Sequence, residues 1–328
     1  MKKRIQKIVN TSMVIITSIL LSSTAHTLEV DKNLPDYIKV SGVSGNIKSI
    51  GSDTLNNLMT LWAEGFHSLY PGVKIEIEGK GSSTAPPALI EGASQFGPMS
   101  REMKPKEKDA FEKKFGYKPS HIRVAVDALA VFVNKDNPIK SLTLQQVDAI
   151  FSKNRKGGFP GNIKIWGELG LKGAWADQPI SLYGRNSASG TYGYFKKVAL
   201  FKGDYKDSVK EQPGSSAVVQ SVASDKYGIG YSGVGYKTAD VRTVPLAVEA
   251  GEESFEANSE NAYSGDYPLS RFLYIYINKK PKHSIDPLRG EFVKYIFSKQ
   301  GQTVVIKDGY YPVSNFIAEK DLGTIGLR

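Results

Sequence analysis

The sequence contains no cysteine and only four histidines among its 328 residues. The absence of cysteine excludes disulfide scaffolds, thiolate metal sites, cysteine nucleophiles and a lipid anchor on an N-terminal cysteine. Because the few histidines are scattered along the chain, we expect no metal site, no metal-dependent catalysis and no cofactor. The 40% hydrophobic and 23% charged residues predict a globular protein with ample material for a core.

The sequence also lacks a hydrophobic run long enough to span a membrane. The apolar stretch Met13–Leu21 is shorter than the ~20 residues that a transmembrane helix needs. It follows four basic residues and precedes Ser23-Thr24-Ala25, which is typical of a secretory signal peptide and its cleavage site. We therefore expect residues 1–25 to be a signal peptide and the mature protein to be exported and soluble. An uncleaved anchor is the alternative.

Basic residues outnumber acidic residues in this sequence. The formal net charge is +10 for the whole chain, and it falls to +6 without residues 1–25, which hold four basic and no acidic side chains. A basic exported protein can bind an anion, a membrane surface or nucleic acid. The Lys and Arg residues are spread along the sequence, so the charge alone indicates a solvated surface, and we expect no nucleic-acid partner.

Strand and helix patterns alternate through the mature chain, which predicts an α/β protein with largely parallel sheets. Short apolar or alternating stretches predict strands at Lys74–Glu78, Ile122–Val133, Ile180–Tyr183, Gly228–Ser232 and Phe272–Ile277. Helical periods predict helices at Thr54–Tyr70, Lys106–Phe115, Leu144–Ser152, Tyr192–Lys202 and Leu288–Ser298.

The length and this alternation together predict two α/β lobes. The long strand that ends at Asn134 takes the chain from the first lobe to the second, and the strand near Phe272 takes it back. The first lobe is predicted to hold residues 45–134 and 271–328, and the second to hold residues 135–270. Because ligands of open α/β sheets bind beyond the carboxyl ends of the strands, we expect the site at strand-to-helix turns.

Two such turns lie in the first predicted lobe. The turn that contains Ser52, Asp53 and Thr54 opens a long helical period, and taken alone it is explained as a helix cap. The turn with Ser82 and Ser83 follows a predicted strand in the same way. Its glycines allow close approach of a ligand to the backbone, and exposed N–H groups at a helix start favour an anion. A flexible turn is the alternative.

A third turn, Gly184–Tyr192, follows the Ile180–Tyr183 strand. It combines a fixed positive charge with hydroxyls and a glycine at a helix start, which suits a tetrahedral oxyanion. The turn has neither the spacing of a phosphate-binding P-loop nor that of a nucleophile elbow, and no base histidine accompanies its serines. The candidate anion-binding residues of this turn are Arg185, Ser187, Ser189, Gly190 and Thr191.

A fourth turn, Gly97–Glu102, adds the hydroxyl of Ser100 and the guanidinium of Arg101. Arg101 is also explained by pairing with a carboxylate such as Glu102. Asp127 stands inside an otherwise apolar strand, where a carboxylate needs partners. It is therefore either a structural hydrogen-bond acceptor or part of the site.

Together these turns resemble the substrate-binding proteins of phosphate ABC transporters, from about Ile47 to Val313. In that family an arginine followed by Ser-Gly-Thr holds phosphate, which carries over to Arg185 and to Ser189-Gly190-Thr191. Ser82 matches the serine of the family's second phosphate turn, and residues 52–54 occupy the first. The resemblance implies a type II periplasmic binding protein fold, in which two lobes close on the ligand.

The same resemblance implies high-affinity binding of inorganic phosphate in the periplasm by a monomer, and its delivery to an inner-membrane ABC permease without catalysis. One departure concerns an aspartate of the family that accepts the proton of hydrogen phosphate, because Ser100 stands in its place. Asp53 and Asp127 are the candidates for that role.

Three alternatives stay open. The protein binds another oxyanion such as sulfate, molybdate or phosphonate, or it is an exported phosphatase with Ser189 or Thr191 as nucleophile, or it is an exported phosphate-scavenging or adhesive surface protein without a permease. The lack of clustered histidines and metal ligands counts against the phosphatase.

Overall fold

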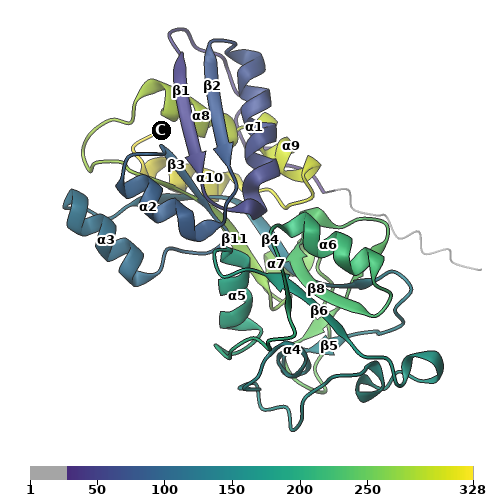
Figure 1. Cartoon of the computed structure of the whole chain (residues 1–328). Coiled ribbons are helices and arrows are strands. Elements are labelled where there is room, and N and C mark those ends of the chain that lie inside the picture. Colours follow the sequence, from purple (N-terminus) through teal and green to yellow (C-terminus); the bar gives the residue numbers. More distant parts are fainter. Residues whose placement is uncertain (1–27, 328) are drawn as a thin grey trace, which may run out of the picture.

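The computed structural model describes residues 28–327, so the predicted signal peptide, residues 1–25, lies outside the described residues. The chain forms two lobes joined by the long strands β4 (Ser120–Asn134) and β11 (Ser270–Ile277) (Figure 1). One path of paired strands runs through both lobes in the order β2-β1-β3-β11-β4-β8-β6-β7, with β9 also paired to β4. Among the described residues, no helix is long and apolar enough to cross a membrane.

The first lobe is built on three parallel strands, β1 (Gly45–Ile50), β2 (Val73–Glu78) and β3 (Phe96–Met99). Helix α1 (Asn56–Leu69) buries Leu58, Met59, Trp62 and Phe66, which recur at helical spacing and cover one face of this sheet. The other helices of this lobe are α2 (Ala85–Ile90), α3 (Pro105–Phe115), α8 (Pro287–Ile296), α9 (Lys299–Lys307) and α10 (Asn315–Thr324).

The second lobe is built on β6 (Ser181–Arg185), which pairs in parallel with β7 (Lys210–Gln212) and β8 (Gly228–Gly233). Helix α6 (Ser215–Ser224) packs on β8, and α5 (Gly190–Val198) follows β6. The remaining elements are β5 (Leu142–Thr143), α4 (Leu144–Phe151), β9 (Val241–Thr243), β10 (Leu246–Ala247) and α7 (Ser259–Ser264).

The strands β4 and β11 are antiparallel to each other and to their neighbours β8 and β3. The expectation of largely parallel sheets is therefore wrong at the centre of the molecule, although the outer strands of both lobes are parallel. The reason is the return of the chain. Because β11 brings the chain back to the first lobe beside β4, it has to run opposite to the strand on which the chain left.

The apolar residues form one large core in each lobe. Residues of β4 up to Ala125 belong to the core of the first lobe, while those from Val126 to Val133 belong to the core of the second. The boundary between the two cores therefore lies in the middle of β4. The sequence predicted that the chain crosses between the lobes at Asn134, which lies several residues further along. The lobe ranges 45–134 with 271–328 and 135–270 stay a prediction. The five strands predicted from the sequence all form, within two residues at each end.

Candidate functional site

The four predicted turns lie together where the two lobes face each other. The turns follow the carboxyl ends of β1, β2, β3 and β6. A Cβ atom placed on Gly190 would lie 2.2 Å from Ser82 Oγ and 2.6 Å from Ser100 Oγ, so the start of α5 lies directly against hydroxyls of the other lobe. Any residue other than glycine at position 190 would clash with these hydroxyls.

The three turns of the first lobe are bonded to one another. The amide of Ser52 donates to the carbonyl oxygen of Pro98 at 2.8 Å, and the amide of Gly81 donates to that of Gly51 at 2.7 Å. The amide of Ser100 donates to Ser82 Oγ at 3.0 Å. Ser52, Ser82 and Ser100 are all buried. These bonds hold three buried serines in adjoining turns, with Ser82 Oγ and Ser100 Oγ 3.2 Å apart.

Helix α5 begins at the junction and is capped there by a serine side chain. Ser189 is the N-cap residue, and its Oγ accepts hydrogen bonds from the amides of Thr191 at 3.1 Å and Tyr192 at 3.3 Å. Thr191 Oγ1 lies 2.9 Å from Thr54 Oγ1 in the opposite lobe. The amide of Ser83 also donates to the carbonyl oxygen of Ala188 at 3.1 Å, so the lobes are in direct contact.

Arg185, the last residue of β6, is a buried cation of this junction, with 2% of its surface exposed. Its Nη1 donates to Ser215 Oγ at 2.6 Å and lies 3.1 Å from Asp53 Oδ2. Burial lowers the pKa of Arg185, and the neighbouring carboxylate of Asp53 opposes that shift. The Nε of Arg185 is buried and has no partner among residues 28–327. One N–H of a rigid fork is thus free to donate to a ligand.

Asp53 crosses from one lobe to the other. Its Oδ2 accepts a hydrogen bond from the amide of Ser215, the first residue of α6, at 2.8 Å and also contacts Arg185. The short 3-10 helix at Asp53–Leu55 has Ser52 as its N-cap residue, with no capping hydrogen bond from a side chain. The capping explanation therefore does not account for Asp53, whose carboxylate faces the N-terminus of α6 and a guanidinium.

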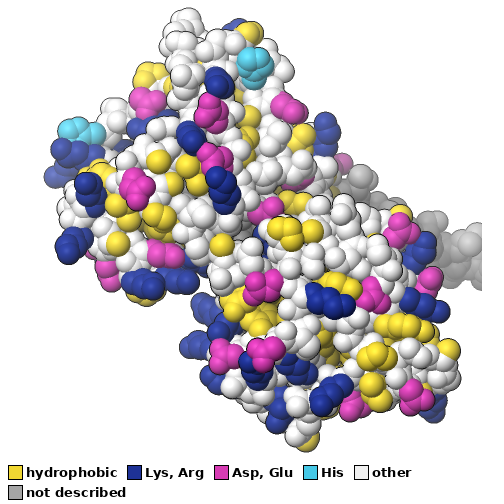
Figure 2. Space-filling model, viewed as in Figure 1, with side chains coloured by type: hydrophobic (Ala, Val, Ile, Leu, Met, Phe, Trp, Pro, Cys, Tyr) yellow, Lys and Arg dark blue, Asp and Glu magenta, His cyan; other side chains and the backbone are white. Residues whose placement is uncertain are grey.

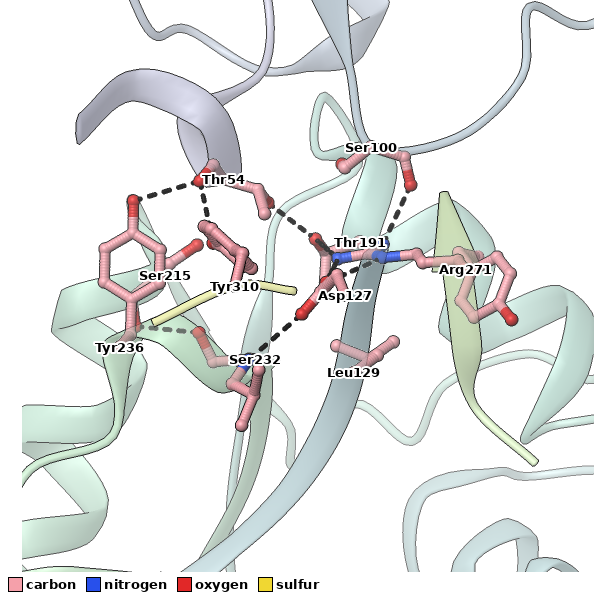
Figure 3. A network of polar contacts seen from close by, with 12 residues as sticks. Thr54, Ser100, Asp127, Leu129, Thr191, Ser215, Ser232, Tyr236, Arg271 and Tyr310 are labelled. Carbon is pink, nitrogen blue, oxygen red and sulfur yellow. Dashed lines mark hydrogen bonds and ion pairs between the residues drawn. The ribbon is translucent and has the colours of Figure 1, made fainter. Parts of the chain in front are cut away.

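Asp127 is held by a second arginine, Arg271, directly opposite it in the pairing of β4 with β11 (Figure 3). Both Nε and Nη2 of Arg271 donate to Asp127 Oδ2, at 2.9 and 2.7 Å. The amide of Val234 donates to Asp127 Oδ1 at 3.1 Å. Arg271 also reaches both lobes, because it donates to the carbonyl oxygen of Ser100 at 2.9 Å and to Thr191 Oγ1 at 3.0 Å.

Three predicted residues lie outside this buried cluster. Arg101 forms two 2.8 Å hydrogen bonds with the carboxylate of Glu107, so the carboxylate that it pairs with is Glu107 and not Glu102. Its Nη2 also donates to Ser83 Oγ at 3.2 Å. Ser187 is exposed. Arg101, Ser83 and Ser187 all line a pocket at the mouth of the junction. The assignment of all thirteen candidate residues as ligands stays a prediction.

Sequence reasoning missed Ser215 and Arg271 as site residues. Ser215 follows Gly214 directly after β7, the same combination of strand, glycine, hydroxyl and helix that marked the other turns, so this signal was present. Arg271 lies in a strand, where turn signals do not apply. Its signal is indirect. A carboxylate in one apolar strand requires a cation, and Arg271 is the charged residue of the other central strand.

Comparison with known proteins defines first the class of protein. Residues 39–300 match the family model described as the PBP superfamily domain, which agrees with the two-lobed sheet. A solved structure from Clostridium perfringens, described as a putative phosphate ABC transporter substrate-binding protein with bound phosphate, superposes with a TM-score of 0.69 at 29% identity. It covers 82% of this chain and 100% of its own.

The particular family follows from the sequence relatives. The phosphate-binding protein PstS of Pseudomonas aeruginosa strain PAO1 is 60% identical over 298 residues, which are 91% of this chain and 92% of that protein. The PstS protein of Staphylococcus aureus strain USA300 is 29% identical over 266 residues, 80% of this chain and 77% of its own. The chain belongs to the PBP superfamily and, within it, to the family of phosphate-binding proteins of ABC transporters.

Proposed function

We propose that this protein binds inorganic phosphate between its two lobes and delivers it to an ABC permease. The observation that carries the proposal is Arg185, a guanidinium with 2% of its surface exposed, whose Nε has no partner among residues 28–327. Buried polar groups in native proteins are nearly always hydrogen-bonded, so an unpartnered donor beside several hydroxyls indicates a ligand that accepts. The name of the P. aeruginosa relative and the phosphate in the C. perfringens structure support the same ligand.

Donors for a tetrahedral anion come from both lobes. Arg185 supplies a planar fork, and the N-terminus of α5 supplies a partial positive charge with the backbone of Gly190. The hydroxyls of Ser52, Ser82 and Ser189 lie in the same buried junction. In this arrangement the protein replaces the hydration shell of phosphate with fixed donors, and closure of the lobes excludes water.

Asp53 is the better candidate for the acceptor of the proton that phosphate carries near neutral pH. Oδ2 of Asp127 is occupied by Arg271, and its Oδ1 by the amide of Val234. Among residues 28–327, hydrogen bonds to the Asp53 carboxylate reach Oδ2 only, and its Oδ1 lies toward Gly214. A carboxylate with an oxygen free to accept matches hydrogen phosphate and repels fully ionised sulfate.

The proposal involves no covalent chemistry. Ser189 Oγ, the candidate phosphatase nucleophile, already accepts two backbone N–H groups as a helix cap. Thr191 Oγ1 contacts Thr54 and Arg271, neither of which is a general base. We propose that the protein acts as a monomer in the periplasm after removal of residues 1–25, with lobes that meet in the middle of β4.

The experiment is calorimetric titration of the purified mature protein with phosphate, sulfate, molybdate, a phosphonate and an aryl phosphate. We expect one phosphate bound per chain, weaker binding of the other anions, and no product from the aryl phosphate. Tighter binding of a different oxyanion would identify that anion as the ligand. Turnover of the aryl phosphate that Ser189→Ala abolishes would favour the phosphatase instead.

A further inference from the structure

A pocket of about 370 Å³ opens at the mouth of the junction between the lobes. We call it the vestibule. Its lining reaches the predicted site at Ser83 and Ser189, and it also includes Ser187, Tyr192 and Gly193. Five further lining residues are cations, and none of the ten is acidic. The cations come from both lobes and are Arg101, Lys104, Lys196, Lys197 and Lys202.

Two of the five cations are already paired and three are not. Arg101 is bonded to Glu107, and Lys196 Nζ lies 2.7 Å from Asp204 Oδ1. Lys104, Lys197 and Lys202 have exposed side chains and form no ion pair with any residue of the range 28–327. The vestibule therefore carries about three uncompensated positive charges. Lys and Arg side chains gather on both sides of the notch between α3 and α5 in the surface view (Figure 2).

The backbone before and at Lys202 has an unusual conformation. Phe201 and Lys202 have φ values of +48° and +63°, a region that residues with a Cβ atom rarely adopt, least of all twice in succession. This turn ends the segment after α5 and returns the amide of Lys202 to the carbonyl oxygen of Lys196 at 2.8 Å. This turn, with its unfavourable backbone conformation, places Lys202 at the vestibule.

A second pocket beside the site has the opposite character. It is lined by Arg185 and Lys206, but also by three carboxylates, Asp204, Asp207 and Glu211. A dianion approaching this opening meets three carboxylates and two cations, whereas the charged residues that line the vestibule are all cations. Of the two openings next to the buried donors, the vestibule is the one that attracts an oxyanion.

We propose that the vestibule is an encounter site for phosphate, which concentrates the ion at the mouth of the cleft and speeds its capture. The proposal rests on the proposed function. Lys104, Lys197 and Lys202 act on the association rate constant and not on the final complex, because the bound ion lies deeper, at Arg185. Charge that only steers a ligand changes the association rate and is screened by salt.

The test compares two triple variants with equal change in net charge. One is Lys104→Gln/Lys197→Gln/Lys202→Gln, and the control is Lys140→Gln/Lys172→Gln/Lys320→Gln, which replaces exposed lysines outside the vestibule. Because the chain has no cysteine, one introduced cysteine at the exposed Ser216, next to the interlobe contact of Ser215, carries a fluorophore in all proteins. Stopped-flow mixing with phosphate then gives both rate constants.

At low salt we expect the vestibule variant to lose about tenfold in association rate, within the range over which steering acts, and the control variant to change less than twofold. The dissociation rate stays within twofold, and the difference between the variants disappears at high salt. Equal losses in both variants, or unchanged rates in both, would overturn the encounter site. A faster dissociation in the vestibule variant alone would show that these lysines hold the bound ion. If the wild-type protein binds no phosphate, the proposed function fails and this inference with it.

Discussion

Two buried arginine–carboxylate pairs lie close together in this protein and differ in what they join. Arg185 and Asp53 come from different lobes, and Nη1 lies 3.1 Å from Oδ2, with 23% of the Asp53 side chain exposed. Arg271 and Asp127 come from the two central strands, with a shortest contact of 2.7 Å and side-chain exposures of 3% and 0%. The first pair bridges the two lobes, while the second is fixed by the pairing of β4 with β11.

Because of this difference, the pair between the lobes suits ligand binding and the pair between the strands suits a structural role. A pair that bridges the lobes can exchange one of its partners for a ligand, and the unpartnered Nε of Arg185 fits that use. A fully buried pair is held because either charge alone would be strongly unfavourable there. Arg271 also donates to the carbonyl oxygen of Ser100 and to Thr191 Oγ1 from the strand that connects the lobes, so it contacts both turns.

The largest effect, on stability, is expected from breaking the ion pair between Asp127 and Arg271. Asp127→Asn leaves the Arg271 guanidinium buried without a counter-ion, and loss of one partner of a buried pair costs about 3–5 kcal/mol. The free energy of unfolding of the ligand-free protein, measured by urea titration, should fall by that amount. The matched variant Asp53→Asn should lose less, because 23% of the Asp53 side chain is exposed to solvent and Arg185 keeps its hydrogen bond to Ser215 Oγ.

The double variant Asp127→Leu/Arg271→Met serves as the control for this comparison. Replacing both charges by apolar groups removes the uncompensated charge, so most of the lost stability should return. Equal destabilisation by Asp127→Asn and Asp53→Asn would contradict the distinction between the two pairs.

The second effect concerns affinity, and it belongs to the pair between the lobes. Arg185→Lys keeps the charge, but a planar fork contacts two oxygens of a tetrahedral anion, whereas an ammonium acts as a point charge. Since a hydrogen bond to a charged group contributes roughly 1.5–3 kcal/mol, phosphate affinity should fall about tenfold or more. Titration calorimetry measures this loss, with Arg289→Lys in the first lobe as a control that keeps wild-type affinity. An unchanged Arg185→Lys variant would remove Arg185 from the site.

The same two pairs explain how far the sequence predicts the molecule. The turns around Asp53 and Arg185 are local patterns of glycine, hydroxyl and helix start, so the sequence predicts that they follow the carboxyl ends of strands, and they follow β1 and β6. The pairing of Arg271 with Asp127 depends on the register of two strands 144 positions apart, which no local pattern contains. The antiparallel direction of β11 was missed for the same reason, since it follows from the chain's path between lobes.

The third effect is a change of selectivity at Asp53. Asp53→Asn removes the charge that repels sulfate and replaces one of the two carboxylate oxygens that can accept from hydrogen phosphate by an amide donor. The ratio of phosphate to sulfate affinity should therefore fall by about tenfold, which corresponds to about 1.4 kcal/mol. Paired calorimetric titrations with the two anions measure the ratio. If Asp53→Asn leaves it unchanged and Asp127→Asn abolishes it, the acceptor is Asp127.

The smallest effect tests a third buried carboxylate, which has an amide in place of an arginine. Asp308 accepts a hydrogen bond from Asn57 Nδ2, and burial raises its pKa from 3.8 to about 6. Because the folded protein holds the proton more tightly than the unfolded chain, the contribution of Asp308 to stability is fully present below pH ~4 and is lost as the pH rises through about 6. Asp308→Asn abolishes this titration, since its amide oxygen still accepts from Asn57 while no charge is buried. After allowance for the partial solvent access of Asp308, the variant should exceed the wild-type free energy of unfolding by about 1 kcal/mol at pH 8 and match it at pH 4. Urea titrations at both pH values measure the difference, and a gain of equal size at both would show that packing, and not the buried charge, sets the stability at this position.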